Sequence, residues 1–205
     1  IIIPQKIELY GSRGNIGHTA TLYRAMASID HQLVRDHSDL VALLSEEVAD
    51  RINKDPKAAF LGGLFHDIGK IILPGVLFNF DKIITNDDYD LIKTHAVKGY
   101  EILKALHPFS ALCAGLHHAV YENGYGITEK DVPHQLGIDT VLQAVEIATI
   151  ISICDFIDAA THRHDKLVGG GTKEPINLPE ALNKKYSNHL DWVKVALRVK
   201  NDLAI

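Results

Sequence analysis

The sequence predicts an all-α fold built as a single domain. Apolar residues recur at three- and four-residue spacing over most of the 205 residues, which is the period of an amphipathic helix. No stretch of useful length alternates apolar and polar residues as a half-buried strand would, and no segment is repeated. A chain of this length is long enough to bury one sizeable core.

The bulk composition excludes several classes of partner. Hydrophobic residues make up 46% and charged residues 23%, with a net charge of −5, so we expect neither duplex nucleic acid nor a membrane as partner. The most apolar stretch, residues 147–154, is too short to span a bilayer, and no signal peptide is visible. Cys113 and Cys154 lie in apolar runs, which favours buried, reduced thiols and a cytoplasmic location.

The first 19 residues are expected to form an arm that precedes a domain spanning residues 20–205. Residues 1–17 read as irregular, and IELY (7–10) fits a short strand or an extended segment. GSRGNIG (11–17) carries three glycines but lacks the GK[ST] of a phosphate-binding loop, so a flexible turn is the better interpretation. The chain begins with Ile1 rather than Met, which favours a piece trimmed from a longer protein.

Helices are predicted along the rest of the first half. Two successive helices would each present an apolar face, and the second face extends back to His37. KDP (54–56) ends this region, and residues 57–68 then read as a central helix that is apolar on every side. The residues of the two faces are Leu22, Met26, Ile29 and Leu33, followed by Val41, Leu44, Val48 and Ile52.

Four further helices are predicted in the second half. They cover residues 86–106 after the cap NDD, residues 108–118 opened by Pro108, residues 139–161, and a last segment that starts at Pro179. YENGYG (121–126) and GGGTKEP (169–175) read as loops. The residues expected to face inward are Ile92, His95, Gly99, Ile102 and Leu106, and later Leu182, Leu190, Val193 and Leu197.

Polar side chains occupy several positions in these helices where hydrophobic ones are expected. Taken singly, a buried histidine bonded to a carbonyl or an aspartate capping a neighbouring helix is the ordinary explanation. Burying many such groups independently would be costly, whereas a shared divalent cation would bind the imidazoles and offset the carboxylate charge. The residues in question are His37, His66, Asp67, His95, His117, His118 and Asp155.

The order of these residues resembles the HD superfamily of metal-dependent phosphohydrolases, and within it the HD-GYP branch. The segments that carry the resemblance are HDIGKI (66–71), KTHAVKGYEIL (93–103), the His117–His118 pair followed by GY, and ICDFIDA (153–159). The resemblance covers roughly residues 20–165. It implies a single HD-domain helical bundle around a central metal site.

The resemblance also implies two adjacent metal sites that share Asp67. One ion would be held by His37, His66, Asp67 and Asp155, and the other by Asp67, His95, His117 and His118. Iron, manganese and zinc all suit such ligands. Lys70 matches the lysine that faces the substrate phosphate, although a surface lysine capping the central helix also fits. Tyr125 matches the tyrosine of GYP. The arginine-containing segment that usually follows IDA is altered to THRHDK (161–166) here, and Arg163 is its candidate phosphate contact.

Three positions depart from the pattern of the branch. Ala119 stands where a glutamate is usual, and Gly126 replaces the proline of GYP in a loop that is one residue shorter. Because glycine is more flexible than proline, we expect a less rigid loop and slow cleavage of cyclic di-GMP. Leu33 stands where some members have a glutamate for a third metal, so we expect two ions per chain.

The function implied by the resemblance is hydrolysis of a nucleotide or cyclic-dinucleotide phosphodiester. A hydroxide bridging the two ions would attack the phosphate, with Asp67 and Lys70 as the catalytic residues. Two alternatives stay open: a di-iron oxygenase of the same superfamily, and a non-catalytic module that binds a nucleotide in signalling. A homodimer is compatible with each of these functions.

Overall fold

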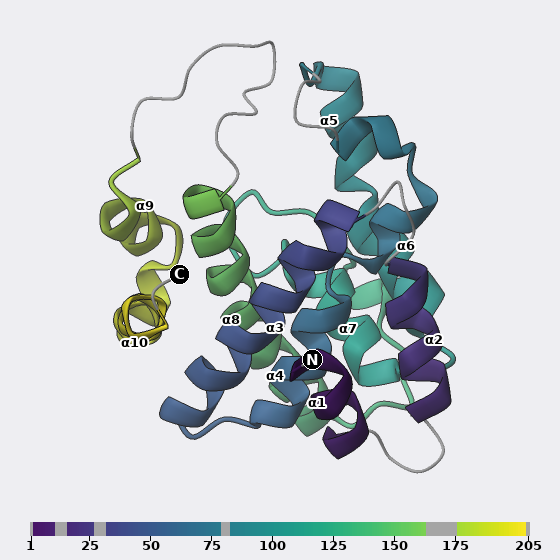
Figure 1. The fold of residues 1–205 in the computed structure, drawn as a ribbon, viewed down its shortest axis with the longest axis horizontal. Helices are drawn as coiled ribbons and strands as arrows, with labels where there is room; N and C mark the ends of the chain where they lie inside the picture. The colour runs from purple at the N-terminus through teal and green to yellow at the C-terminus, as the bar shows by residue number, and fades with distance from the viewer. Residues whose placement is uncertain (1, 11–15, 27–31, 79–82, 163–175, 204–205) are drawn as a thin grey trace.

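The regular structure of this protein is helical, as the sequence predicts. The computed structural model describes residues 2–10, 16–26, 32–78, 83–162 and 176–203 (Figure 1). The α-helices are α1 (Ile2–Tyr10), α2 (Ile16–Met26), α3 (Gln32–Arg51), α4 (Pro56–Phe65), α5 (Asn86–Lys93), α6 (His95–Leu103), α7 (Pro108–Leu116), α8 (Ile138–His162), α9 (Leu178–Lys185) and α10 (Leu190–Asp202). Short 3₁₀-helices are η2 (Ile68–Ile72), η3 (Gly75–Phe78), η4 (Glu129–Asp131) and η5 (Ser187–His189).

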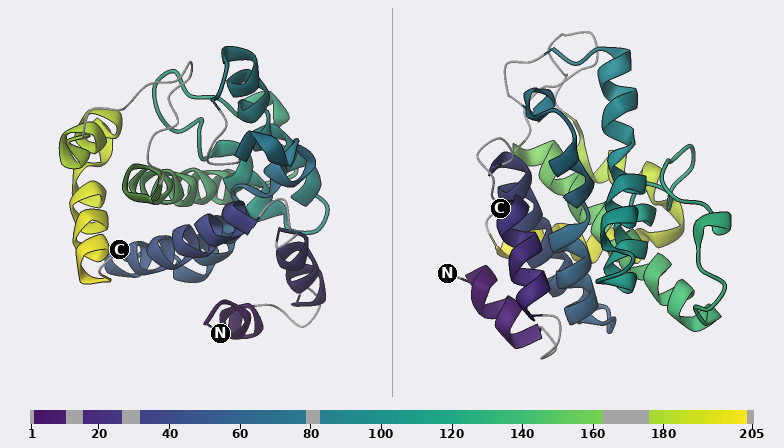
Figure 2. Two further views of the ribbon diagram at one scale, coloured as in Figure 1. Left: turned by 45° about the horizontal axis from the view of Figure 1, so that its top comes forward. Right: turned by 90° about the vertical axis from the view of Figure 1, so that its right-hand side faces the viewer.

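Helix α8 forms the centre of the bundle. It packs against α3, α4 and α7, and the C-terminal pair α9 and α10 also contacts it (Figures 1 and 2). By length and composition its segment Ile138–Thr161 could cross a membrane, and 56% of the apolar window is buried inside the fold. Core helices of folded proteins pass the same test, and these contacts account for the apolar composition of α8.

The core consists of two clusters of buried side chains. In the first, the predicted face of α3 packs against α8 and the C-terminal helices, and Leu182 and Val193 point inward as expected. The second joins α4, α6 and α7 with α1 and α2. Representative members are Val41, Leu44, Val48, Ile147 and Ile151 in the first cluster, and Phe60, Leu64, Phe65, Leu103 and Leu112 in the second.

The expectation of an irregular N-terminal segment is wrong. Residues 2–10 form α1, which buries Ile3 and Ile7 one helical turn apart. The Lys6 ammonium lies 2.6 Å from the Glu46 carboxylate, which also accepts a hydrogen bond from the Tyr10 hydroxyl. These long-range contacts with α3 stabilise a helix that the local sequence does not predict. Residues 11–15 of the glycine-rich turn lie outside the described residues.

Several helix bounds also differ from those expected. Helix α4 begins at Pro56 and ends at Phe65, just before His66. The predicted helix over residues 86–106 is two helices, and the cap of α5 is Thr85 rather than NDD. Its hydroxyl accepts from the Asp88 amide at 3.1 Å, and the Asp88 carboxylate accepts from the Thr85 amide at 3.0 Å.

Two residues expected to point inward in the second half of the chain are exposed instead. Leu106 is 38% exposed because α6 ends at Leu103, so it no longer follows the buried stripe. Leu190 is 42% exposed because η5 separates α9 from α10, and Leu190 starts the second of these helices. The last helix predicted from Pro179 is thus a pair. Ile29 and residues 169–175 lie outside the described residues.

Candidate metal centre

Three histidines stand where one helix ends or the next begins. His66 and His117 directly follow α4 and α7, and His95 is the first residue of α6. In each ring Nδ1 donates to the carbonyl three residues earlier, in the last turn of α4, α5 or α7, where carbonyls lack intrahelical partners. The distances are 2.7 Å to Gly63, 2.6 Å to Ile92 and 2.7 Å to Ala114. Because a carbonyl only accepts, a neutral ring bound in this way has a bare Nε2.

The break between α5 and α6 is what turns His95 inward. The Thr94 hydroxyl donates to the Leu91 carbonyl at 2.6 Å, and His95 Nδ1 uses the Ile92 carbonyl. A continuous helix would offer both carbonyls to main-chain amides. Side-chain donors therefore compete with the helix at this point, and the chain starts a new helix at His95.

The other two histidines are held by side chains. His37 Nδ1 donates to the carboxylate of Asp158, which extends from α8. His118 Nδ1 lies 3.0 Å from the Tyr121 hydroxyl. Sequence reasoning missed Asp158, although its place one turn after Asp155 in ICDFIDA puts both carboxylates on the same side of α8.

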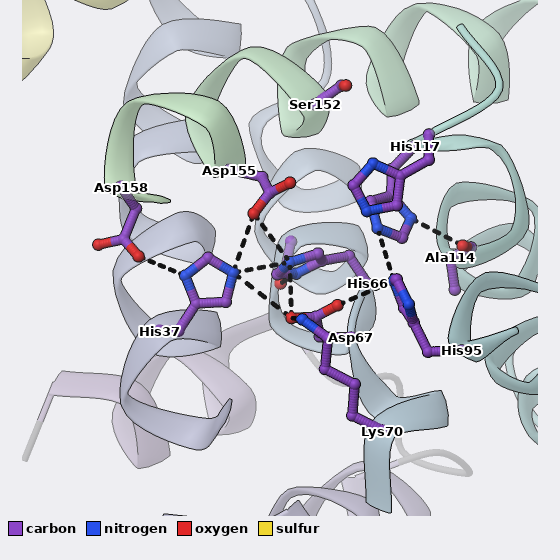
Figure 3. A network of polar contacts seen from close by, with 12 residues as sticks. His37, His66, Asp67, Lys70, His95, Ala114, His117, Ser152, Asp155 and Asp158 are labelled. Atoms are coloured by element: carbon purple, nitrogen blue, oxygen red, sulfur yellow. Dashed lines mark hydrogen bonds and ion pairs between the residues drawn. The ribbon is translucent and has the colours of Figure 1, made fainter. Parts of the chain in front are cut away.

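The first group of ligand atoms gathers around His37. Its Nε2 lies 3.1 Å from His66 Nε2 and 3.1 Å from Asp155 Oδ1. Asp67 Oδ2 is 3.5 Å from the Nε2 atoms of both histidines. Figure 3 shows these four side chains converging from α3, from the end of α4 and from α8.

The second group lies on the other side of Asp67. His95 Nε2 is 3.3 Å from His117 Nε2 and 3.1 Å from Asp67 Oδ1. Ligand atoms of His95, His117 and His118 all lie within 4.8 Å of one another. The two oxygens of one carboxylate therefore face different groups of histidines (Figure 3).

Burial keeps three imidazoles of this centre neutral. It lowers the pKa of His66 to about 4 and that of His118 to about 3, and holds the pKa of His117 well below its usual range. Neutral imidazole is the form that binds a metal ion. These three rings are therefore in the ligand form at neutral pH.

The two carboxylates are ionised in the same surroundings. Burial raises the pKa of Asp67, but Lys70 and the histidines His66 and His95 outweigh it and hold that pKa well below the usual value. Burial likewise raises the pKa of Asp155, but the contact with the His37 ring and the nearby rings of His118 and His66 more than reverse this effect.

The donor set fits divalent cations. In neutral rings, the Nε2 pairs at 3.1 and 3.3 Å bring two lone pairs face to face, which is repulsive unless a cation lies between them. Imidazole nitrogens with carboxylate oxygens suit iron, manganese or zinc. The seven residues expected from the sequence are thus brought together as two groups that share Asp67.

Lys70 is buried beside this centre. It is only 5% exposed, its ammonium is paired with Asp67 Oδ2, and it lies 5.9 Å from the Phe78 ring. The alternative of a surface lysine that caps the central helix is therefore wrong.

A Cβ added to Gly69 would lie 2.0 Å from the His95 carbonyl oxygen. Only glycine allows η2 to lie so close to the start of α6, which sets Asp67 beside His95.

Tyr125 covers the second group of ligands. Its ring centroid lies 4.5 Å from that of His118 and 6.1 Å from that of His95. The loop is tied to α7, because the Tyr125 amide donates to the His118 carbonyl at 2.9 Å and the Ile127 amide to the Gly115 carbonyl at 3.0 Å.

The expected looseness of this loop at Gly126 does not fit these bonds. Gly126 has a φ of +134°, a conformation that proline cannot adopt. A Cβ there would lie 2.1 Å from the Gly115 carbonyl oxygen and 3.7 Å from the Ala119 Cβ. The two departures from the usual motif are thus neighbours in space, and the glycine is required by the path of the chain.

The structure does not test the predictions made for the remaining site residues, Leu33 and Arg163. Leu33 lies one turn before His37 on α3 and is 40% exposed, whereas its neighbour Val34 is buried. Arg163 lies outside the described residues. The count of two ions and the phosphate contact of Arg163 therefore stay predictions.

A family model and a curated relative agree with the family resemblance of the sequence. The HD domain family matches residues 34–182. The cyclic di-GMP phosphodiesterase PA4108 of Pseudomonas aeruginosa is 28% identical over 145 residues, which are 68% of this chain and 33% of that protein. The chain therefore spans about a third of the length of this curated relative.

Two crystal structures of the HD domain of the L. monocytogenes phosphodiesterase PgpH share the fold. One is of the domain itself and the other of its complex with cyclic-di-AMP. Both have a TM-score of 0.58 and cover 87% of this chain, with 19% and 20% identity over 94% and 92% of the respective neighbour chains. Since the family match extends over most of the sequence and includes every residue of the two ligand groups, this chain belongs to the HD domain family.

Proposed function

We propose that this protein is a metal-dependent phosphodiesterase of HD-GYP type that hydrolyses a nucleotide or cyclic-dinucleotide phosphodiester. The observation that carries the proposal is the carboxylate of Asp67, which lies between two groups of inward-facing imidazole nitrogens. The names of the relatives support the substrate class, since one is a cyclic di-GMP phosphodiesterase and another was crystallised with cyclic-di-AMP.

The charge of the centre suits a phosphodiester. Two divalent ions would outweigh the charges of Asp67 and Asp155, which leaves the site positive. When bound, the ions would supply Lewis-acid activation of water and neutralisation of phosphate charge. Around them, the buried histidines keep their Nε2 atoms inward because their Nδ1 atoms are already bonded.

The residues beside the ligands have separate roles in this proposal. Lys70 places an ammonium next to Asp67, where it would bind a phosphate oxygen as negative charge grows. Tyr125 forms a wall over His118 and His95 against which the substrate would lie. Arg163, in the altered segment THRHDK, would be a further contact for phosphate.

The test is metal analysis of protein purified without oxygen, followed by a substrate panel. We expect about two ions per chain, and hydrolysis of at least one of cyclic di-GMP, cyclic di-AMP and bis(p-nitrophenyl) phosphate. A chelator should abolish hydrolysis, and iron, manganese or zinc should restore it. Metal-loaded protein that hydrolyses none of these compounds would contradict the proposal. Oxygen consumption by the reduced iron form would instead indicate the oxygenase.

A further inference from the structure

Of the seven ligand residues, only two are partly accessible to solvent. His37, His66, Asp67, His95 and His117 are at most 6% exposed. His118 and Asp155 are partly exposed, with 14% of the Asp155 side chain accessible. A substrate therefore approaches past the end of α7 and the side of α8 that carry these two residues.

A lysine from the C-terminal helices lies at this opening. The Lys185 ammonium of α9 is 3.7 Å from the Tyr121 ring centroid and 4.8 Å from that of Phe156, with Tyr186 at 5.7 Å. Tyr121 bonds His118, and Phe156 follows Asp155 in α8. Lys185 thus sits against the neighbours of the two accessible ligands.

The Lys185 ammonium forms no salt bridge within the described parts of the chain, although the charge of Asp155 acts on it. The side chain is half-buried against aromatic faces, and no carboxylate or hydrogen-bond acceptor meets its ammonium there. Aromatic rings attract an ammonium but leave its three N–H donors free for an acceptor. Five other lysines pair with carboxylates: Lys6, Lys54, Lys93, Lys104 and Lys194.

We propose that Lys185 binds a second phosphate group of the substrate, distinct from the one held at the metal centre. A cyclic dinucleotide carries two phosphates in one ring, so when one is at the metals the other must lie near the opening. An ammonium is a compact point charge that suits phosphate. Helix α9 thereby contributes to substrate specificity. The inference rests on the proposed phosphodiesterase function.

The experiment compares three variants. Lys185→Met keeps the aliphatic stem and removes the charge, Lys185→Arg keeps a charge, and Lys184→Met removes the exposed neighbouring charge as a control. Equilibrium binding of phosphorothioate analogues of cyclic di-GMP and cyclic di-AMP is measured on metal-loaded protein. KM is then measured for the cyclic dinucleotides and for bis(p-nitrophenyl) phosphate, which has one phosphate, alongside metal content and Tm.

We expect Lys185→Met to weaken binding of the preferred analogue by about 10- to 100-fold, the range of a lost charge-assisted hydrogen bond. The rise in KM should be much larger for the cyclic dinucleotide than for the aryl ester. Lys185→Arg should recover most of the affinity, and Lys184→Met should bind like the wild type. Metal content and Tm should stay at wild-type values.

Three kinds of result would overturn the inference while leaving the proposed function intact. Unchanged analogue binding in Lys185→Met is one. Another is an equal rise in KM for both substrates together with a lowered Tm, seen in Lys185→Arg as well as in Lys185→Met. That result would mean that Lys185 serves the packing of α9. A wild-type protein that hydrolyses only the aryl ester would also remove it. A wild type that hydrolyses nothing would remove the proposed function and this inference together.

Discussion

Asp67 is the residue on which both ligand groups depend. Its Oδ2 faces His37 and His66 and its Oδ1 faces His95. Asp155 serves the first group only. The two carboxylates are therefore not equivalent, although both are buried near the same histidines.

Replacing Asp67 should remove both ions at once. We expect Asp67→Ala to lose both metals and at least about 10²- to 10³-fold of the hydrolysis rate, because each group loses a shared ligand. Asp155→Ala should lose one ion, and Asp139→Ala, an exposed change on α8, should keep two. Elemental analysis with circular dichroism checks the counts and the fold. Retention of one ion in Asp67→Ala would disprove the bridging role.

Asp158 should act through His37. It holds His37 Nδ1 and so fixes where Nε2 points. We expect Asp158→Ala to weaken metal binding at the first group by about 10- to 100-fold while the second ion stays bound. Asp36→Ala, an exposed change on α3, is the control in a metal titration. Equal affinity in Asp158→Ala and wild type would show that packing alone orients the ring.

The buried histidines should make the metal-free protein sensitive to acid. The pKa of His66 is about 4 in the folded chain, against an ordinary value of 6.5. The unfolded chain thus takes up this proton first as pH falls. The contribution of His66 to the free energy of unfolding is complete above pH 6.5. It is lost on acidification towards pH 4, which lowers that free energy by roughly 3 kcal/mol.

Urea unfolding of chelator-treated protein between pH 7 and pH 4 measures this effect. His66→Gln should flatten the fall in stability, and replacement of the exposed His134 by Gln should not. A wild-type stability that is constant over this range would contradict the assignment. His118, whose pKa is lowered to about 3 by burial, leaves a remaining slope in the His66 variant.

At the scale of elements, helix ends rather than helix faces aim the ligands. The carbonyls of Gly63, Ile92 and Ala114 belong to the last turns of α4, α5 and α7, and each holds an imidazole. A helical stripe would place the same histidines on an inward face but would leave their rings free to rotate. The junctions therefore define the site more than the helices themselves do.

The loop after α7 gives the prediction at this scale. Gly126→Pro would recreate the usual GYP letters, yet we expect it to destabilise the protein by about 1–3 kcal/mol or more, because the chain there has a positive φ. Gly126→Ala should also destabilise, since its Cβ would meet the Gly115 carbonyl oxygen.

Urea unfolding and the KM for the preferred diester test this loop. Gly137→Ala is the control, because an added Cβ there meets nothing within 4 Å. Wild-type stability in Gly126→Pro would show that the loop adopts a second path. Slow cleavage of cyclic di-GMP stays a prediction, but loop flexibility is no longer its reason.

For the whole molecule, the all-helical class and the HD domain family followed from the sequence. The apolar face of α3 was readable because local periodicity sets it, and the helix over residues 139–161 was readable from its apolar composition. Helix α1 was not readable, because its stability comes from the burial of Ile3 and Ile7 and from the bonds of its polar side chains to Glu46 in the distant helix α3. The break at Thr94 was missed for a different, local reason, since side-chain donors compete there with the main chain.

The ligand set could be predicted because buried polar residues are rare and their order is specific. What surrounds it could not. Asp158 looks like any other helical aspartate until α8 is placed beside α3. Lys185 stands 30 positions after Asp155 in the sequence and reaches the opening only through the packing of α9 on α8.

The ligands also come from segments that are far apart in the chain, and this has a consequence for the lifetime of the protein. His37 is 29 positions from His66 and 121 from its partner Asp158. Ions held by such segments act as cross-links that close long loops, which the unfolded chain cannot keep closed without them. An ion present at 1,000 times its dissociation constant would add about 4 kcal/mol to folding. Resistance to proteases would then follow the supply of metal, so starvation for the ion would lower the amount of the protein as well as the activity proposed for it.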